Sequence, residues 1–504
     1  MRGKVMALVA VVVIVAIAVA GVVWAVNRDD SKTPPASAPP STTATDDPTT
    51  APTESPSIGT TVDPADPKWK AAESRPVEDS KYPNVGDPSV DALHYGLDLT
   101  WDPEGGRLTG VATIAFRATV TQDLFQLDLS DALKVDGALL DGEEVEVSHI
   151  GKDLVVKAPV QADSRHVLVV EYAGSPESYP APTTRSDLST VGWTVTDTGG
   201  AWTMQEPYGA FTWYPVNDQP SDKAFYDFTL RAPAPMVGVA NGELTSRTTE
   251  AGMEVTAFTL SSPASSYLTT VAFDDYVMGE GTSSSGVPLT WWTPRGDTRS
   301  AKAMAKLPQA FDWVESKLGP YPFDRLGGVV VPSQTAMETQ TMITFGNTPY
   351  TLDITTLVHE TTHQWYGDAV SPTDWSDVWM NEGMTTYLDF IWESEHGRSL
   401  DRVLREAAPY ESMHRAESGP PGDYDPRAFG QTNIYYGPAL MWHQVRERIG
   451  DDKFWEMVRA WPTVHRFGNA SRDTYLAWVE KQTGADLKDL FDAWLLGKKS
   501  PKLG

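Results

Sequence analysis

The stretch "LVHETTHQWYGD", Leu357 to Asp368, carries two histidines four residues apart, with a glutamate directly after the first. Residues at i and i+4 lie on one face of a helix about 6 Å apart, so His359 and His363 can bind one metal ion from a single helix. Glu360 lies about a quarter-turn away, where a general base would act on a water at that ion. An HExxH pattern alone is weak, because most chance matches are solvated helix faces.

A third ligand is available in "DVWMNEGMTTYLDF", where Glu382 follows His363 by 19 positions (363 to 382). This separation fits a reversal of the chain followed by the start of an antiparallel helix. Catalytic zinc commonly has three protein ligands and one open position, so the sequence predicts one Zn2+ per chain, held by His359, His363 and Glu382. The other histidines show no ligand spacing and are interpreted as structural or exposed: His94, His149, His166, His396, His414, His443 and His465.

Composition excludes several classes of function. The chain has 504 residues, of which 40% are hydrophobic, enough for more than one domain with its own core. Its formal net charge of −28 repels phosphate backbones, so no nucleic-acid partner is expected. It contains no cysteine, which excludes disulfides, thiol catalysis and cysteine-based zinc sites.

The N-terminus predicts export. Arg2 and Lys4 precede an uncharged run over residues 5–26, and a helix of that length, ~33 Å, can cross a ~30 Å hydrocarbon layer. Residues 1–4 are then a cytoplasmic n-region, 5–26 a transmembrane signal-anchor, and the body lies outside the cytoplasm in a single-pass membrane protein. The alternative is a signal peptide cleaved after the small-x-small pattern at residues 18–20, which would release a secreted protein.

The rest of the chain divides by composition and periodicity. Residues 27–81 are rich in proline, serine, threonine and aspartate, and we expect a disordered stalk there. Residues 82–283 contain short alternating runs such as "HYGLDLTWD" and "HVLVVEYAG", which predict an antiparallel, sandwich-like β domain. Residues 284–504 have mainly helical periodicity, as in "SAKAMAKLPQAFDWVESKLG". The sequence therefore predicts an α+β multidomain fold.

"VHETTHQWYGD" followed by "WMNEGMTTY" resembles the M1 (gluzincin) family of zinc aminopeptidases. "GPYPFDRLGGVVVP" and "EPYGAFTWYPVNDQPSDKAFYDF" extend the resemblance, which covers residues 82–504. It implies a thermolysin-like catalytic domain after the β domain, in a short form without the family's long C-terminal helical domain. It also implies that the protein removes N-terminal residues from peptide substrates that have a free amino terminus.

The resemblance assigns a substrate-binding segment. In the family a G-x-M-E-N strand binds the substrate's amino terminus through its glutamate. The corresponding run here, "TAMETQT", keeps Ala336, Met337 and Glu338. Thr335 and Thr339 replace the glycine and the asparagine. The family motif therefore does not predict the backbone contacts to the substrate or the size of the pocket for its first side chain.

Two further site residues follow from the resemblance. A second amine-binding acid corresponds to Glu206, with Gln205 as the neighbouring alternative, and the family's cis peptide predicts a cis Glu206–Pro207 bond. An oxyanion-stabilising tyrosine corresponds to Tyr435 in "NIYYGPALMWHQV", with Tyr436 as its rival. With Glu360 as general base, these residues make a metallo-aminopeptidase the expected function. An endopeptidase on the same scaffold and an inactive surface-binding protein are the alternatives.

Overall fold

Strand β1 (Val90–Asp102) lies near the middle of the largest sheet in the computed structural model, which describes residues 62–503. Its alternating sequence turns Leu97, Leu99 and Trp101 to the buried side. It pairs in parallel with β12 (Lys223–Pro233) and antiparallel with β2 (Arg107–Ala118). The sheet has the order β14-β15-β12-β1-β2-β8-β4-β5, and its other strands are β4 (Leu133–Leu140), β5 (Glu143–Glu144), β8 (Arg165–Gly174), β14 (Glu243–Glu250) and β15 (Met253–Ser265).

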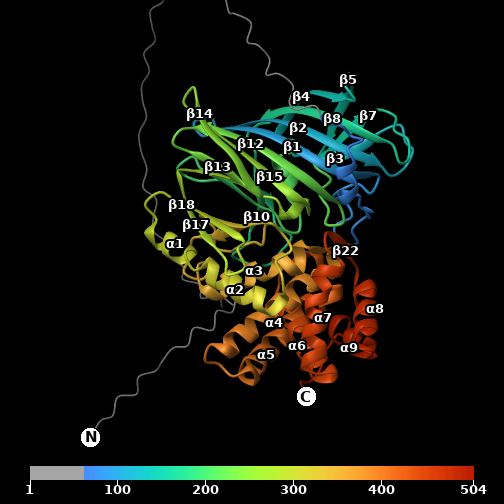
Figure 1. The fold of residues 1–504 in the computed structure, drawn as a ribbon. Helices are drawn as coiled ribbons and strands as arrows, with labels where there is room; N and C mark the ends of the chain where they lie inside the picture. Colours follow the sequence, from blue (N-terminus) through green and yellow to red (C-terminus); the bar gives the residue numbers. More distant parts are fainter. Residues whose placement is uncertain (1–61, 504) are drawn as a thin grey trace, which may run out of the picture. The chain divides into compact units, whose positions relative to one another are not determined.

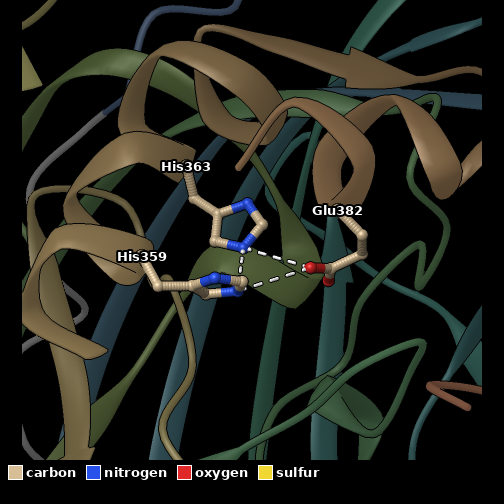
Figure 2. A group of neighbouring side chains, drawn as sticks. All are labelled: His359, His363 and Glu382. Carbon is tan, nitrogen blue, oxygen red and sulfur yellow. Dashed lines mark hydrogen bonds and ion pairs between the residues drawn. The ribbon is translucent and has the colours of Figure 1, made fainter. Parts of the chain in front are cut away.

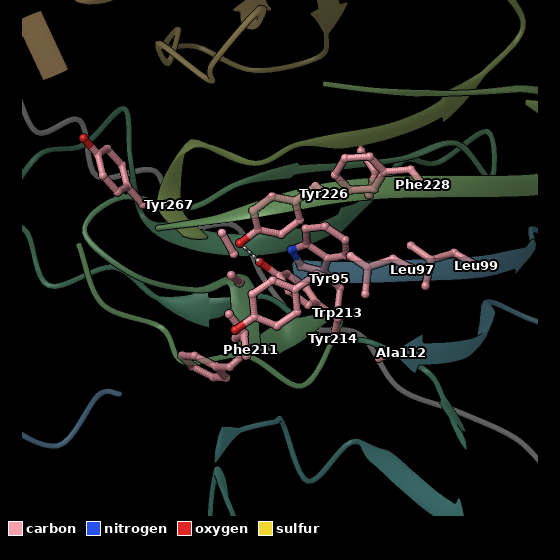
Figure 3. Packing of buried hydrophobic residues seen from close by; sticks show 14 of the residues in the cluster. Tyr95, Leu97, Leu99, Ala112, Phe211, Trp213, Tyr214, Tyr226, Phe228 and Tyr267 are labelled. Carbon is pink, nitrogen blue, oxygen red and sulfur yellow. Dashed lines mark hydrogen bonds between the residues drawn. The ribbon is translucent and has the colours of Figure 1, made fainter. Parts of the chain in front are cut away.

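Two smaller sheets cover the buried side of this large sheet. Trp193 of one of them packs against Trp101 with ring centroids 5.2 Å apart, and Figure 3 shows Tyr95, Tyr214 and Tyr226 in the core of the N-terminal half. Layered sheets are the sandwich-like arrangement predicted from the alternating runs, although the pairing of β1 with β12 is parallel and not antiparallel as predicted. The strands are β9 (Tyr179–Pro180), β10 (Thr190–Val195), β11 (Ala201–Met204), β13 (Val237–Ala240) and β16 (Val271–Asp274) in one sheet, and β3 (Phe125–Asp128), β6 (Glu146–Ile150) and β7 (Asp153–Lys157) in the other.

Residues 62–81 are not a disordered stalk, so the predicted boundary at residue 81 is wrong for this part. A 3-10 helix spans Pro67–Ala72, and its Trp69 is buried against His94, with ring centroids 4.7 Å apart. Further on, the Asp79 carboxylate accepts hydrogen bonds from the backbone N–H groups of Tyr82 and Trp375. Composition does not predict such an ordered segment, because a single large aromatic side chain is enough to anchor it to the domain and hardly changes the proline-rich average.

The C-terminal half begins with a four-stranded sheet of order β17-β18-β19-β20. Strand β19 (Leu326–Val331) is the apolar run "LGGVVV", and it is buried along its whole length because it pairs in parallel with a neighbour on each side. The remaining strands are β17 (Tyr276–Thr282), β18 (Pro288–Pro294), β20 (Met342–Gly346) and the short pair β21 (Val370–Pro372) and β22 (Gly468–Ala470).

Nine α-helices occur among the described residues, and all of them lie in the C-terminal half. Figure 1 shows the strands of the N-terminal half, blue to green, at one end of the described region and helices α4 to α9, orange to red, at the other. The helices are α1 (Thr298–Met304), α2 (Leu307–Leu318), α3 (Ile354–His363), α4 (Trp379–Glu395), α5 (Leu400–Ser418), α6 (Asn433–Ile449), α7 (Asp451–Val464), α8 (Arg472–Thr483) and α9 (Lys488–Leu495).

The chain reverses direction between α3 and α4. Asp353 caps α3 by accepting from the N–H of Thr355, and the helix ends at His363. Gly367 then has φ 132°, a conformation that favours glycine, and a Cβ there would lie 3.2 Å from Asn381. This turn brings the start of α4 back beside α3, as the spacing between the two motifs predicts.

The α+β fold class, with a β domain followed by a mainly helical domain, is confirmed. Among residues 62–503, no helix combines the length and apolar character needed to cross a membrane. The predicted transmembrane segment, residues 5–26, and most of the predicted stalk lie outside the described residues.

Candidate metal centre and active site

Three side-chain donor atoms converge between helices α3 and α4, as Figure 2 shows. The Nε2 atoms of His359 and His363 are 3.3 Å apart, and Glu382 Oε2 lies 3.5 Å and 3.4 Å from them. Zinc bonds of ~2.0–2.1 Å in a tetrahedral site place the ligand atoms ~3.3–3.4 Å from one another. The three donors therefore have the spacing of one face of a zinc tetrahedron.

The opposite ring nitrogens of both histidines have partners of their own. His359 Nδ1 lies 2.7 Å from Asp389 Oδ2, and His363 Nδ1 lies 3.1 Å from the carbonyl oxygen of Tyr366. Both partners are acceptors, so each Nδ1 carries the proton and each Nε2 presents its lone pair to the centre. Two lone pairs at 3.3 Å need a cation between them.

The acidic residues around this centre leave negative charge without a partner. Carboxylate oxygens of Glu206, Glu338 and Glu382 lie within 4.8 Å of one another, and Oε1 of Glu206, Oε1 of Glu338 and Oε2 of Glu382 are buried without a hydrogen bond. Burial acts to lower the pKa of His363, but Glu338 and Glu382 outweigh it and raise that pKa to about 9, so these carboxylates favour a positive charge at its Nε2, whether a proton or a metal ion. The donor set and its surplus negative charge fit a divalent metal together with a second cationic group.

Glu360 lies on α3 between the two histidines, and its side chain is buried. One of its carboxylate oxygens, one from Glu338 and a ring nitrogen of His363 lie within 4.8 Å of one another. Burial raises the pKa of Glu360 to about 7. A carboxyl group with a pKa near neutrality can both accept and release a proton at that pH.

The segment "TAMET" forms only an isolated bridge and not the continuous strand of the family motif. Met337 and Thr344 exchange two backbone hydrogen bonds of 2.9 Å and 3.0 Å, which fixes Glu338 at the edge of β20. The Thr339 hydroxyl donates to the carbonyl oxygen of Met342 and lies 3.0 Å from the hydroxyl of Thr344. Thr339 thus uses its side chain for hydrogen bonds inside the sheet.

Glu206 and Gln205 point to different surroundings. The Gln205 amide is buried and donates to the carbonyl oxygen of Thr269 at 2.5 Å, inside the β domain. Glu206 instead lies beside Glu338, and burial together with that neighbouring carboxylate raises the pKa of Glu206 well above its usual value. The Glu206–Pro207 peptide bond is cis, as predicted.

Tyr435 and Tyr436 sit at the start of α6 and face opposite ways. The ring of Tyr435 is 6.2 Å from that of His359 at an angle of 25°, which places it beside the metal donors. Tyr436 packs against Phe390, with ring centroids 5.7 Å apart, in the apolar core of the helical domain. Of the two, only Tyr435 is directed to the site.

Sequence reasoning missed two polar residues next to this site. Asp389 follows Glu382 by seven residues in the same helix, a spacing that puts both on one face, so the heptad step was a usable signal. Arg185 comes from a loop of the β domain, and its guanidinium lies 3.4 Å from the Tyr435 hydroxyl. Nothing in its local sequence, "APTTRSDLS", predicts that contact.

Comparison with known proteins agrees with this geometry. Two family models match the chain: the peptidase M1 N-terminal domain over residues 91–268 and the peptidase family M1 domain over residues 302–494. Aminopeptidase N of Streptomyces lividans is 25% identical over 438 residues, covering 81% of this chain and 50% of its own. The human thyrotropin-releasing hormone-degrading ectoenzyme is 27% identical over 335 residues, covering 58% and 31%.

Solved structures give a fuller overlap. The M1 zinc metallopeptidase of Deinococcus radiodurans superimposes with a TM-score of 0.74 at 25% identity, covering 85% of this chain and 99% of its own. A further structure of that protein is a mutant bound to a Tyr-Ser-Ala substrate. The chain spans about half the length of the S. lividans relative but nearly all of the Deinococcus structure. Both domain matches occur in the expected order, and the second spans His359, His363 and Glu382; they identify this chain as a member of peptidase family M1.

Proposed function

We propose that this protein is a zinc aminopeptidase that removes residues from the free amino terminus of peptides. The observation that carries the proposal is a pair of buried carboxylate oxygens without a hydrogen bond, Oε1 of Glu206 and Oε1 of Glu338, beside the three metal donors. A protonated amino terminus offers one positive charge and three N–H donors, which match two such carboxylates. A blocked amino terminus would leave both charges without a partner in a buried site.

His359, His363 and Glu382 are the proposed zinc ligands, on the strength of their mutual distances and fixed tautomers. When bound there, zinc supplies a Lewis acid that polarises a carbonyl group and makes a water more acidic. Family membership and the zinc metallopeptidase of D. radiodurans support zinc over other metals.

Glu360 is the proposed general base. It takes a proton from the attacking water and passes it to the scissile nitrogen, which leaves as the new amino terminus of the shortened peptide; its position on α3 puts its carboxylate beside His363. Burial raises its pKa to about 7, and positive charge at the neighbouring centre acts in the opposite direction, favouring the ionised form that a base requires.

Tyr435 is the proposed donor to the oxyanion of the tetrahedral intermediate, because its ring lies against that of His359. Ala336 and Met337 are proposed to line the binding site of the first substrate residue. Met337 commits its backbone to Thr344, so its contribution is the buried side chain, while Ala336 precedes it at the edge of the sheet.

The test compares one peptide with a free and with an acetylated amino terminus. We expect turnover of the free peptide only, and Glu338→Gln should lower kcat/KM for it by roughly 10- to 100-fold, the loss of one charge-assisted hydrogen bond. Equal cleavage of both peptides would identify an endopeptidase instead. No cleavage of either by zinc-loaded protein would favour a binding protein without activity.

We further propose that the catalytic body acts outside the cytoplasm, anchored by residues 5–26 or released after cleavage. The uncharged run behind Arg2 and Lys4 supports this, and one relative is named as an ectoenzyme. Protease added to intact cells should degrade an anchored body. A secreted body should instead be found in the culture medium before any protease is added. A body that stays protected inside intact cells contradicts the proposal.

A further inference from the structure

Arg185 brings a positive charge from the β domain to the candidate active site. It lies in the loop between β9 and β10, and its side chain is 13% exposed. Nε and Nη2 bind the two carboxylate oxygens of Asp187 at 3.1 Å and 2.7 Å. This bidentate pair fixes the plane of the guanidinium group.

The other donors of Arg185 reach the segments that build the site. Nη1 lies 3.3 Å from the carbonyl oxygen of Gly430 and 3.4 Å from the Tyr435 hydroxyl, and Nη2 lies 3.4 Å from the Thr335 hydroxyl. A guanidinium has five N–H donors, and all five have an acceptor in this arrangement. The side chain therefore joins the β-domain loop to the segment before α6 and to the segment before Glu338.

The β-domain loop is held against the segment before α6 by contacts on both sides of Arg185. The backbone N–H of Phe429 donates to the carbonyl of Pro182 at 3.0 Å, and the Gln431 amide donates to the Thr184 hydroxyl at 2.7 Å. Gly430 lies between them with φ 70°, and a Cβ there would lie 3.0 Å from Arg185 Nη1. The packing of the β-domain loop against the segment before α6 therefore holds the guanidinium close to Tyr435.

A phenol that accepts a hydrogen bond on one side directs its own proton elsewhere. Tyr435 accepts from Arg185, and among residues 62–503 its hydroxyl donates to no protein acceptor. The ring lies beside that of His359, with centroids 6.2 Å apart, so a proton directed away from Arg185 can face the metal donors. A positive donor behind the oxygen also strengthens the O–H as a donor.

We propose that Arg185 is a positioning residue, which orients the Tyr435 hydroxyl so that its proton faces the substrate carbonyl. This inference rests on the proposed aminopeptidase function and deepens it. The other role open to an arginine beside the candidate active site is binding the carboxyl end of a short peptide. That role would require Arg185 to give up one of its five contacts, because none of its donors is free.

The test is a double-mutant cycle of Arg185→Met and Tyr435→Phe, measured on a free-amino peptide. Arg185→Met should lower kcat by roughly 10-fold with KM unchanged, the effect of losing one hydrogen bond to a charged group. In the Tyr435→Phe background the same change should have no further effect, because the hydroxyl on which it acts is gone. Gln431→Ala, which breaks a neighbouring contact between the same two segments, should keep the parent kcat.

Several results would overturn the inference. These are an unchanged kcat in Arg185→Met, the same fold loss in both backgrounds, or an equal loss in Gln431→Ala. A rise in KM confined to peptide acids, absent with peptide amides, would assign Arg185 to carboxylate binding. Zinc content and melting temperature measured on each variant separate these outcomes from misfolding.

A crystal structure of Arg185→Met provides a readout that does not depend on activity. We expect the Tyr435 side chain to move or to occupy more than one position, whereas an unchanged single position contradicts the inference. If the parent protein fails to cleave free-amino peptides, the proposed function is wrong. The crystal structure of Arg185→Met still shows whether Arg185 fixes the position of the Tyr435 side chain.

Discussion

Removing the Asp389 carboxylate should weaken zinc binding although no zinc ligand is lost. Asp389 Oδ2 lies 2.7 Å from His359 Nδ1 and fixes both the tautomer and the orientation of that ring. In Asp389→Ala the ring keeps its place in α3 but loses its only carboxylate partner at Nδ1 among the described residues. Loss of such a partner typically lowers metal affinity 10- to 100-fold, or about 1.4–2.7 kcal/mol.

The assay is a competitive zinc titration of metal-free protein against a chromophoric chelator. Asp141→Ala is the matched control, because Asp141 Oδ2 accepts from His166 Nδ1 at the same 2.7 Å distance, in the β domain. The control should bind zinc with the parent affinity. An unchanged affinity in Asp389→Ala, or an equal loss in Asp141→Ala, would refute the reasoning.

Three other changes have defined outcomes. Glu360→Gln should retain zinc and lose kcat by ~10²–10⁴-fold, and parent-like turnover would remove Glu360 from its role. Zinc at 100 times its Kd should stabilise the protein by about 2.7 kcal/mol, a shift in melting temperature that chelator reverses and that His363→Ala should not show. Burial lowers the pKa of Lys223 to about 7, so between pH 7 and ~10 the unfolded chain binds more protons and stability rises with pH. The advantage in unfolding free energy of Lys223→Met should therefore shrink from pH 7 to 9.5, and a constant difference would contradict this assignment.

The features that could be predicted from the sequence are those with a local spacing. The i, i+4 step of His359 and His363 and the glutamate 19 positions later fix two helices and a reversal between them, which is how the structure places them. Alternation in β1 predicted a strand with one buried face. The cis Glu206–Pro207 bond could be predicted because proline lowers the free-energy cost of a cis peptide bond at that position.

The features that could not be predicted depend on contacts between distant segments. Arg185 reaches Tyr435 across 250 positions of sequence, and no periodicity records such a contact. Trp69 anchors residues 62–81 through His94, although the surrounding composition is typical of a disordered linker. Thr339, which departs from the family motif, donates its hydroxyl to the carbonyl oxygen of Met342 in the sheet, a contact that the sequence does not predict.

The central claim is that one zinc ion binds between α3 and α4. An anomalous-difference map at the zinc edge, from crystals of the zinc-loaded protein, tests it directly. We predict a single strong peak ~2.0–2.1 Å from Nε2 of His359, Nε2 of His363 and a carboxylate oxygen of Glu382. A map without a peak there, or with zinc bound only elsewhere, would contradict the account.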